Sequence, residues 1–352
     1  MRFLTERMGG VSVKIIVDAM GGDNAPGAVV RGALGAHKLH GVDILLVGRT
    51  ADILKAVEEC GEKTLPDGVE IRDAQEVVEI ADAPATAFKK KKDSSLTIGL
   101  TLLRDGAGDA FVSAGSTGAL LSGATLLVKR IRGIRRAAMG PTLPTATGRV
   151  ILCDCGANAV CNAEDLLQFA YLGSYYAKRV GGVDNPRVGL LNIGAEEEKG
   201  DPLRHDAYAL LKKAGDAGRI QFIGNVEASD AMLGKADVLV ADGFTGNVML
   251  KSVEGTGKFF LKELKKLFLS NAKTKIAAAM IKGDMSDMRK ALDPNEIGGT
   301  PFLGISRPVI KAHGSSNARA ISNAILRAKE YAESGFIDDV QQNVGLMRIG
   351  RP

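Results

Sequence analysis

The stretch VKIIVDAMGGDNAPGAVVRGAL, residues 13–34, contains a strand, a turn and a helix in succession. Its first half is a short run of β-branched residues that stops at Asp18, and its second half predicts a helix that opens at Pro26. The connection between them, residues 18–23, brings two glycines, Gly21 and Gly22, close to two acids, Asp18 and Asp23. A simple connection needs none of these features, so the turn is a candidate functional loop.

Short apolar runs rich in β-branched residues recur along the chain, and amphipathic stretches long enough to form helices separate most of them. This alternation predicts parallel strands, because a parallel connection needs a dozen or more residues to return to the same edge of a sheet. We therefore predict an α/β fold with a doubly wound, largely parallel sheet. The predicted strands are residues 15–17, 44–47, 69–71, 110–112, 150–152, 188–191, 220–223 and 238–241.

The composition of the 352 residues is that of a globular α/β protein, with 43 glycines and 5% aromatic residues. The net charge of +5 is mild, and no uniform basic run indicates a nucleic-acid partner. The first twelve residues lack the apolar core of a secretory signal, and no window of about eighteen apolar residues would span a bilayer. We therefore expect a cytoplasmic protein.

Four cysteines in a chain of this length do not make a disulfide framework. Cys153, Cys155 and Cys161 lie close in sequence, but their spacing differs from that of zinc sites and no histidine is near. We expect buried, reduced thiols and no metal.

Polar loops follow most of the predicted strands, and each contains Gly with Asn, Ser, Thr or an acid. Ligands of parallel sheets bind beyond the carboxyl ends of the strands, where loop N–H groups and helix N-termini converge. One such loop is an ordinary turn or helix cap, but six on one edge favour a site for an oxyanion such as phosphate. The loops are residues 18–23, 113–118, 154–158, 192–200, 224–227 and 242–247.

A seventh segment, PVIKAHGSS at residues 308–316, predicts a strand followed by a helix from about residue 317. Ser315 or Ser316 is either the N-cap of that helix or part of an anion cradle with Lys311 and His313. The residues expected to bind phosphate or substrate are Asp18, Gly21, Gly22, Gly115, Ser116, Thr117, Gly118, Asn158, Asn225, Asp242, Gly243, Thr245, Gly246, Asn247, Lys311, Gly314, Ser315 and Ser316.

The common nucleotide-binding motifs are absent from the sequence. Gly255-Thr256-Gly257-Lys258 resembles the end of a P-loop, but Ser252 stands where the first glycine belongs, and Phe259 replaces the hydroxyl residue that holds magnesium. No G-x-G-x-x-G motif opens the chain. The G-x-S-x-G motif of a nucleophilic serine is also absent.

Eight segments together resemble the bacterial phosphate acyltransferases of phospholipid synthesis, the PlsX family, from about residue 13 to 332. They are VDAMGGDNAP, VSAGSTGAL, GPTLPT, DCGAN, GLLNIGAEEEKG, FIGNVEASD, DGFTGNVMLK and IKAHGSSNA. The resemblance implies an isopropylmalate-dehydrogenase-like fold, a homodimer, peripheral association with the membrane, and no cofactor. It also implies a reaction in which an acyl carrier protein thioester and inorganic phosphate give acyl phosphate and free carrier. Ser116 departs from the Asn common in that family.

The resemblance further implies that Lys199 is the leading catalytic candidate, which positions phosphate or stabilises developing negative charge. His313 is the second candidate, as a proton donor to the departing thiol or as a phosphate ligand. The acids Asp18 and Asp23 are expected to orient loop N–H groups and cations, because they would repel phosphate. The alternative for Lys199 is a surface lysine paired with Glu196 or Glu197, and for His313 it is a satisfied core or capping imidazole.

Residues 251–292 predict a basic amphipathic helical segment that protrudes from the fold. Its apolar side chains have two possible roles. They pack against the core or a second subunit, or they form a face that rests on an anionic membrane. The basic face would also attract an acidic carrier protein. The residues expected at the membrane or dimer contact are Phe259, Phe260, Leu264 and Phe268.

We predict an N-terminal extension (1–12), one α/β catalytic domain (13–340, with the helical insert at about 251–292) and a C-terminal tail (341–352). Three rival functions remain open. They are a phosphate acetyltransferase-like enzyme that uses an acyl coenzyme A, a membrane scaffold without catalysis, and a metal- and nicotinamide-dependent decarboxylating dehydrogenase. The last would gather Asp154, Asp242 and Glu227 around a divalent ion.

Overall fold

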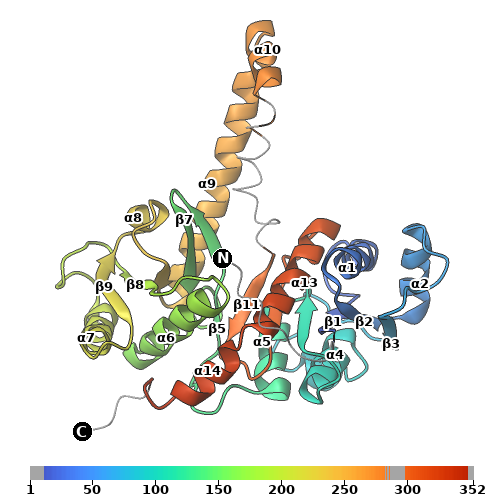
Figure 1. The fold of residues 1–352 in the computed structure, drawn as a ribbon, viewed down its shortest axis with the longest axis horizontal. Helices are drawn as coiled ribbons and strands as arrows, with labels where there is room; N and C mark the ends of the chain where they lie inside the picture. Colours follow the sequence, from blue (N-terminus) through green and yellow to red (C-terminus); the bar gives the residue numbers. More distant parts are fainter. Residues whose placement is uncertain (1–11, 282, 284, 286–297, 348–352) are drawn as a thin grey trace.

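The computed structural model describes residues 12–281, 283, 285 and 298–347, and Figure 1 shows their arrangement. The predicted α/β class is confirmed, and the strands of the described residues are divided between two sheets instead of one. In both sheets the neighbouring central strands are parallel, as the alternation of strands and helices predicts.

The first sheet has the strand order β3-β2-β1-β4-β12-β11-β5, in which only the β11 contacts with β12 and β5 are antiparallel. The opening stretch of sequence forms β1 near its centre, followed by helix α1. The strands are β1 (Lys14–Asp18), β2 (Asp43–Gly48), β3 (Val69–Asp73), β4 (Ala110–Ser113), β5 (Ala138–Met139), β11 (Thr300–Leu303) and β12 (Val309–Lys311).

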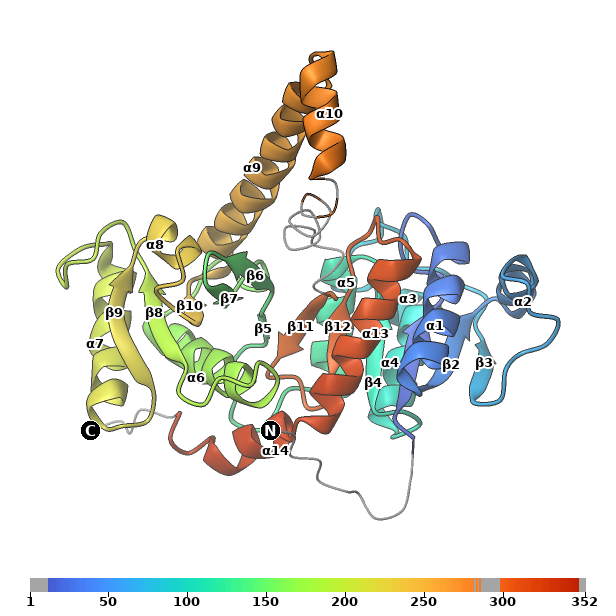
Figure 2. The same ribbon diagram turned by 45° about the horizontal axis from the view of Figure 1, so that its top comes forward.

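Both faces of the first sheet are buried, which explains why β1 is apolar at successive positions rather than alternating. Ile15 and Val17 pack in one apolar cluster with α1 and α13, whereas Ile16 packs in another with α4. Helices α1 and α13 lie side by side on one face in Figure 2. The helices around this sheet are α1 (Gly27–His40), α2 (Thr50–Glu59), α3 (Ala87–Lys90), α4 (Ser95–Arg104), α5 (Thr117–Gly123), which continues as η1 (Ala124–Val128), and α13 (Ala318–Glu333).

The second sheet has the order β6-β7-β10-β8-β9, and only the β6–β7 pair is antiparallel. Helices α6 and α7 pack on one face, while α8 and the start of α9 pack on the other. The elements are β6 (Thr142–Thr145), β7 (Gly148–Cys153), α6 (Ala163–Arg179), β8 (Arg187–Leu191), α7 (Pro202–Asp216), β9 (Gln221–Val226), α8 (Ala228–Met232), β10 (Val238–Val240) and α14 (Phe336–Asn343), which packs on α6.

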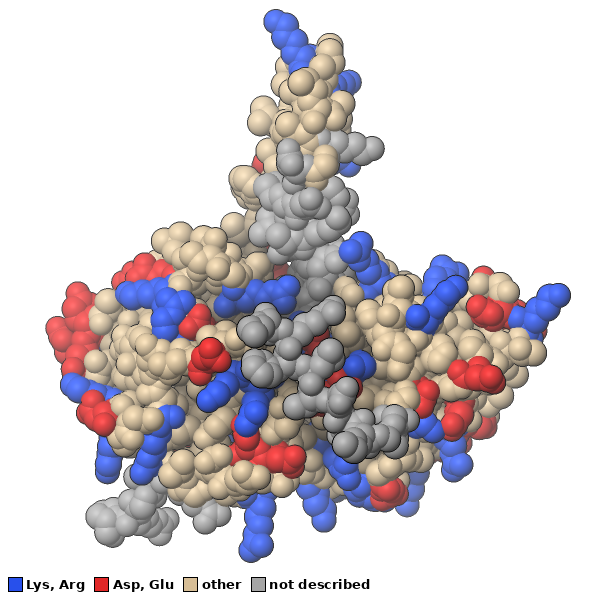
Figure 3. All heavy atoms as spheres, viewed as in Figure 1, with Lys and Arg blue, Asp and Glu red and all other residues tan. Residues whose placement is uncertain are grey.

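The predicted basic segment forms part of a long helix, α9 (Gly243–Leu269), and a shorter one, α10 (Ala272–Met280), which fold back on each other. They project from the body of the molecule in Figure 1, and Figure 3 shows basic side chains at the far end. Gly255-Thr256-Gly257-Lys258 lies inside α9 and is therefore no P-loop. Residues 282, 284 and 286–292 of the predicted segment lie outside the described residues.

Of the predicted terminal segments, residues 1–11 and 348–352 lie outside the described residues, and 341–343 belong to α14. Within the part of the chain that the structure describes, no helix combines the length and the apolar composition needed to cross a membrane.

Candidate active site

Three neighbouring strands of the first sheet, β1, β4 and β12, end in the polar residues Asp18, Ser113 and Lys311. All three are buried. The Ser113 hydroxyl donates to Asp18 Oδ2 at 2.6 Å, and the Met20 N–H donates to Asp18 Oδ1 at 3.1 Å. Burial raises the pKa of Asp18, and these hydrogen bonds oppose the rise. The carboxyl therefore organises the ends of β1 and β4, as expected for an acid that does not itself bind phosphate.

Lys311 places an ammonium group where these strands end. Its Nζ donates to the carbonyl oxygen of Ala114 at 3.3 Å and to that of Ala312. Burial lowers the pKa of Lys311 from 10.5 to about 8, although the charges of Asp18 and Asp23 favour the protonated form. The hydrogen bonds of this ammonium group go to neutral carbonyl oxygens, so its positive charge can still attract an anion.

The Met20–Asp23 turn contacts the loops after β4 and β12, and this close contact explains why the turn contains glycine. The Asp23 N–H donates to the Gly314 carbonyl at 2.8 Å, which ties the first loop to the third. Gly22 has φ +102°, and a Cβ on it would lie 2.9 Å from the Ala114 Cβ and 3.0 Å from the Gly314 oxygen. Only glycine allows so close an approach in this backbone conformation.

His313 is exposed at the start of the loop after β12. Its Nδ1 accepts from the Ser315 N–H at 3.2 Å and lies 2.9 Å from the Ser315 hydroxyl. The neutral ring therefore carries its proton on Nε2. Although the residue is exposed overall, partial desolvation of its ring, and then the charge of Lys251, lower the pKa of His313, so the neutral form is favoured at neutral pH.

The N-cap of α13 is Asn317, whose Oδ1 accepts from the Ala320 N–H at 2.9 Å. Of the two alternatives for Ser315 and Ser316, the helix cap is therefore wrong, because the side chain of Asn317 accepts the capping bond. Both serines instead belong to the loop that Asn24 holds, through bonds of 3.2 Å from its amide to their carbonyl oxygens.

The loop after β4 leads directly into α5. Ser116 is the N-cap residue but makes no side-chain cap bond, and Gly115 donates its N–H to the Ser113 hydroxyl at 3.0 Å. Thr117 and Gly118 form the first turn, where a Cβ on Gly118 would meet the Pro84 ring at 2.9 Å. Gly118 therefore serves packing, while the Ser116 hydroxyl makes no cap bond to α5.

In the second sheet, the fully buried Asp154 organises the loop after β7. Its carboxylate accepts five hydrogen bonds, from the N–H groups of Met139, Cys155, Ala157 and Asn158 and from the Asn158 side chain, at 2.7–3.3 Å. Burial raises the pKa of Asp154 and the donors oppose this rise. Asn158 is thereby fixed, and its carbonyl accepts the Gly243 N–H at 2.8 Å.

The residues at the start of α9 serve mainly to cap and pack this helix. Asp242 accepts from the Thr245 N–H at 2.9 Å and hydroxyl at 2.8 Å, and it pairs with Arg204 of α7. A Cβ on Gly246 would lie 2.0 Å from the Asp154 carbonyl oxygen, and one on Gly243 would lie 2.6 Å from Asp154 Oδ2. These contacts hold α9 against the loop after β7.

Lys199 lies exposed on the loop after β8. Asn192 donates to the Lys199 carbonyl at 2.9 Å, and the buried Asn225 of β9 donates to the Glu196 carbonyl at 2.7 Å. Glu197 pairs with Lys212 at 2.9 Å, so it does not neutralise Lys199. Within the described residues Lys199 has no ion pair, which leaves its ammonium group free for a substrate.

The predicted site residues therefore form two groups, one at the carboxyl edge of each sheet. Two charged residues of α9 lie close enough to both groups to affect the pKa of a residue in each. The charges of Lys251 and Glu254 affect the pKa of both His313, after the first sheet, and Cys155, after the second. They share one face of α9 with Asn247, a predicted site residue.

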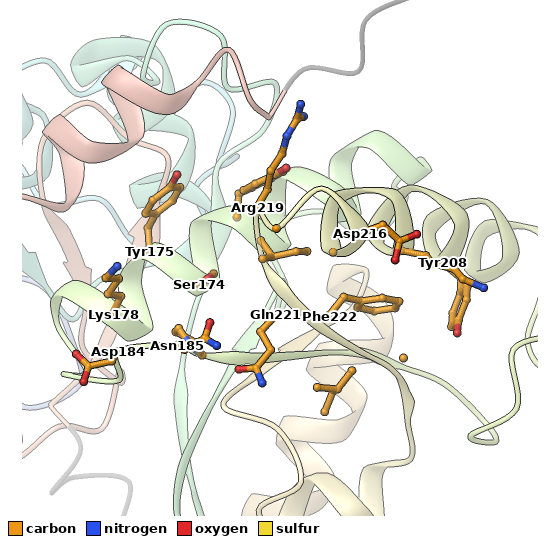
Figure 4. Close-up of a pocket in the computed structure, with 18 residues that line it drawn as sticks. Ser174, Tyr175, Lys178, Asp184, Asn185, Tyr208, Asp216, Arg219, Gln221 and Phe222 are labelled. Carbon is orange, nitrogen blue, oxygen red and sulfur yellow. The ribbon is translucent and has the colours of Figure 1, made fainter.

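A pocket of about 760 Å³ lies away from both groups, near the starts of β8 and β9. Figure 4 shows Tyr175, Lys178, Asn185 and Arg219 around it. The loops of the predicted site follow the ends of strands, so this pocket is on the opposite edge of the second sheet.

Comparison with known proteins gives one consistent family. Residues 13–339 match the family described as fatty acid synthesis protein. The chain is 45% identical over 336 residues to a phosphate acyltransferase from Acetivibrio thermocellus, which covers 95% of this chain and 97% of that protein. It is 44% identical over 340 residues to a phosphate acyltransferase from Listeria welshimeri, with 96% and 98% covered.

Among solved structures, a phosphotransacetylase from Streptococcus pyogenes has a TM-score of 0.62 and 18% identity over 91% of this chain and 94% of that one. At this identity the likeness concerns the fold alone. The sequence matches extend over nearly the whole chain, and they show that it belongs to the phosphate acyltransferase family and is a transferase that acts with an acyl group and phosphate.

Proposed function

We propose that this enzyme converts an acyl-[acyl carrier protein] and inorganic phosphate into acyl phosphate and free carrier. The observation that supports this most directly is the buried ammonium group of Lys311 beside His313 and Ser315, where loops from three strands meet. A cation, a ring N–H and hydroxyl groups make a site for the phosphate dianion.

In the proposed reaction a phosphate oxygen attacks the thioester carbonyl, the new C–O bond forms, and the C–S bond breaks. Hydrogen phosphate supplies the proton that the released thiol finally carries, so no covalent enzyme intermediate is required. Lys311 and the surrounding loop N–H groups hold phosphate in position, which removes much of the entropic barrier. Lys199 stabilises the negative charge that develops on the carbonyl oxygen.

Of the two roles considered for His313, its geometry supports that of a hydrogen-bond donor. Nδ1 is engaged by Ser315, and the lowered pKa favours a neutral ring with its proton on Nε2. A neutral imidazole donates a hydrogen bond to phosphate or to the carbonyl oxygen more readily than it gives up its proton.

The hydrogen bonds of Asp154 and Asp242 argue against the rival function of a metal- and nicotinamide-dependent dehydrogenase. Asp154 accepts five hydrogen bonds from the loop that it organises, and Asp242 is paired with Arg204 and bonded to Thr245. Neither acid has the free oxygen atoms that a divalent ion needs.

An assay of the wild-type enzyme tests the proposal. Purified protein with palmitoyl carrier protein and labelled phosphate should form a product that hydroxylamine destroys. Acetyl coenzyme A and palmitoyl coenzyme A serve as rival donors. Faster reaction with either coenzyme A thioester would refute the carrier protein as the preferred donor.

The pKa of Lys311 makes phosphate binding depend on pH. Lys311 is charged below about pH 8 and neutral above it, so phosphate affinity should fall by about tenfold as pH rises from about 7 to 9. Calorimetric titration of the enzyme with inorganic phosphate at several pH values measures this. Lys311→Gln should bind weakly throughout with a smaller pH response, and since the titration of phosphate itself affects both proteins alike, parallel profiles would contradict the assignment.

We further propose that the enzyme works as a homodimer and that α9 and α10 contact an anionic membrane. Phe259 and Phe260 of α9 have exposed fractions of 64% and 53%, and no residue of α10 is buried. Lysines flank these apolar side chains, as in helices that lie at a lipid surface. An acyl phosphate with a long chain is poorly soluble, which gives the enzyme a reason to work at a membrane.

The double variant Phe260→Asp with Leu264→Asp should lose flotation with vesicles that contain anionic phosphatidylglycerol. Removing two apolar side chains from lipid contact costs about 3 kcal/mol or more, which corresponds to at least a hundredfold weaker partition. Leu39→Asp, a similar change at an exposed site on α1, is the matched control. Undiminished flotation of a folded dimeric double variant would remove the membrane proposal.

A further inference from the structure

Asn192, the first residue after β8, closes the loop that carries Lys199. Its Nδ2 donates to the Lys199 carbonyl at 2.9 Å, and its Oδ1 accepts from the Ile193 N–H at 2.8 Å. Its own N–H donates to the carbonyl of Val226, the last residue of β9, at 3.1 Å. One residue therefore joins both ends of this loop and attaches them to the second sheet.

Further hydrogen bonds hold the turn that precedes Lys199. The Lys199 N–H donates to the Glu196 carbonyl at 3.2 Å, and the buried Asn225 of β9 donates to the same carbonyl at 2.7 Å. Gly200, which follows Lys199, has φ +108°, and a Cβ on it would lie 2.8 Å from Asn192 Oδ1. The N–H and the carbonyl of Lys199 are thus both engaged, which fixes its backbone.

The same loop directs the side chain of Lys199. A Cβ on Gly194 would lie 2.9 Å from Lys199 Cγ and 3.3 Å from Lys199 Cδ, so the methylene groups lie against the Gly194 backbone. Among the described residues Lys199 forms no ion pair, since Glu197 pairs with Lys212 instead. The backbone of the loop therefore determines where the ammonium group can reach.

We propose that Asn192 is a positioning residue for Lys199. Its amide holds the backbone of the lysine so that the ammonium group meets the oxyanion that forms on the thioester carbonyl. This inference rests on the proposed function, in which Lys199 stabilises that charge. A displacement of about 1 Å can cost about a hundredfold in rate, so losing the bond to the Lys199 carbonyl should slow the chemical step without weakening substrate binding.

Steady-state kinetics of two variants test the proposal. Asn192→Ala removes both bonds of the side chain, whereas Asn192→Asp retains the acceptor for the Ile193 N–H and turns an oxygen toward the Lys199 carbonyl. Both should lower kcat by about tenfold or more, with both KM values within about threefold of wild type. Asn185→Ala is the matched control, because Asn185 is exposed and precedes the same strand, and its kcat should stay within about twofold of wild type.

A double variant distinguishes a positioning role from a purely structural one. If Asn192 acts through Lys199, its loss has no effect once the ammonium group is gone. Asn192→Ala combined with Lys199→Ala should therefore be at most about twofold slower in single turnover than Lys199→Ala alone. A residue that only supports the fold would lower the rate by the same factor in both backgrounds, and that result would overturn the proposal. Should Asn192→Ala fail to fold, Asn192→Asp replaces it in this comparison.

Two further results would also overturn the positioning role. One is a wild-type kcat for folded Asn192→Ala, and the other is a raised KM at unchanged kcat, which indicates a residue that binds substrate. Wild-type activity of Lys199→Ala is a separate outcome, because it refutes the catalytic role of Lys199 on which the positioning depends. If the wild-type enzyme rejects acyl carrier protein, only the proposed donor is wrong, and the same variants are compared with palmitoyl coenzyme A.

Discussion

Lys199→Ala should lower kcat for acyl phosphate formation by about a hundredfold or more, with little change in stability. Removing one donor to a developing oxyanion costs about 10²–10³ in rate in enzymes of acyl transfer. Lys199 is exposed on a loop, and within the described residues no acid neutralises it, so its loss leaves no buried partner behind. Single-turnover measurement of acyl phosphate, which separates chemistry from product release, measures the effect directly.

Lys212→Ala is the matched control for this substitution. Lys212 belongs to α7, pairs with Glu197 on the same loop as Lys199 and is equally exposed to solvent. Its removal changes the charge of the region by the same amount without removing the proposed catalytic group, so kcat should stay within about twofold. Equal losses in the two variants would indicate a general electrostatic effect, and an active Lys199→Ala would show that the assignment is wrong.

The sequence predicts the helices and strands of this fold better than it predicts which strands belong to which of the two sheets. Buried strands such as β1 have unbroken β-branched runs, and long helices have clear apolar stripes, because these signals depend on residues near in sequence. Division into two sheets depends on which strand pairs with which. For example, β11 and β12 belong to the first sheet although they follow all strands of the second sheet in the sequence, and only long-range packing determines that pairing.

The candidate site shows the same limit. Glycines, acids and cations at strand ends were recognised, and many of them meet in the loops after β1, β4 and β12. Their individual tasks depend on neighbours distant in sequence. Asp242 meets Arg204 across two elements, and Asn317 rather than a serine caps α13.

Asp154→Asn should destabilise the protein by about 3 kcal/mol and also abolish most of the activity. The substitution retains the shape of the side chain but replaces one acceptor oxygen by an NH₂ group. Whichever way the amide turns, at least two of the five donors around it then face a donor. An unsatisfied buried donor costs about 1–3 kcal/mol. Because the side chain is fully buried, no water replaces the missing acceptor.

Chemical denaturation at neutral pH measures the loss of stability, and the assay for acyl phosphate measures the loss of activity. Activity should fall even at denaturant concentrations below the midpoint, since Asp154 fixes Asn158, whose carbonyl accepts the N–H of Gly243 at the start of α9. Asp230→Asn is the control, because Asp230 forms an exposed pair with Lys235 and such pairs contribute at most about 1 kcal/mol. If Asp154→Asn were as stable and active as the control, this carboxylate would not organise the loop after β7.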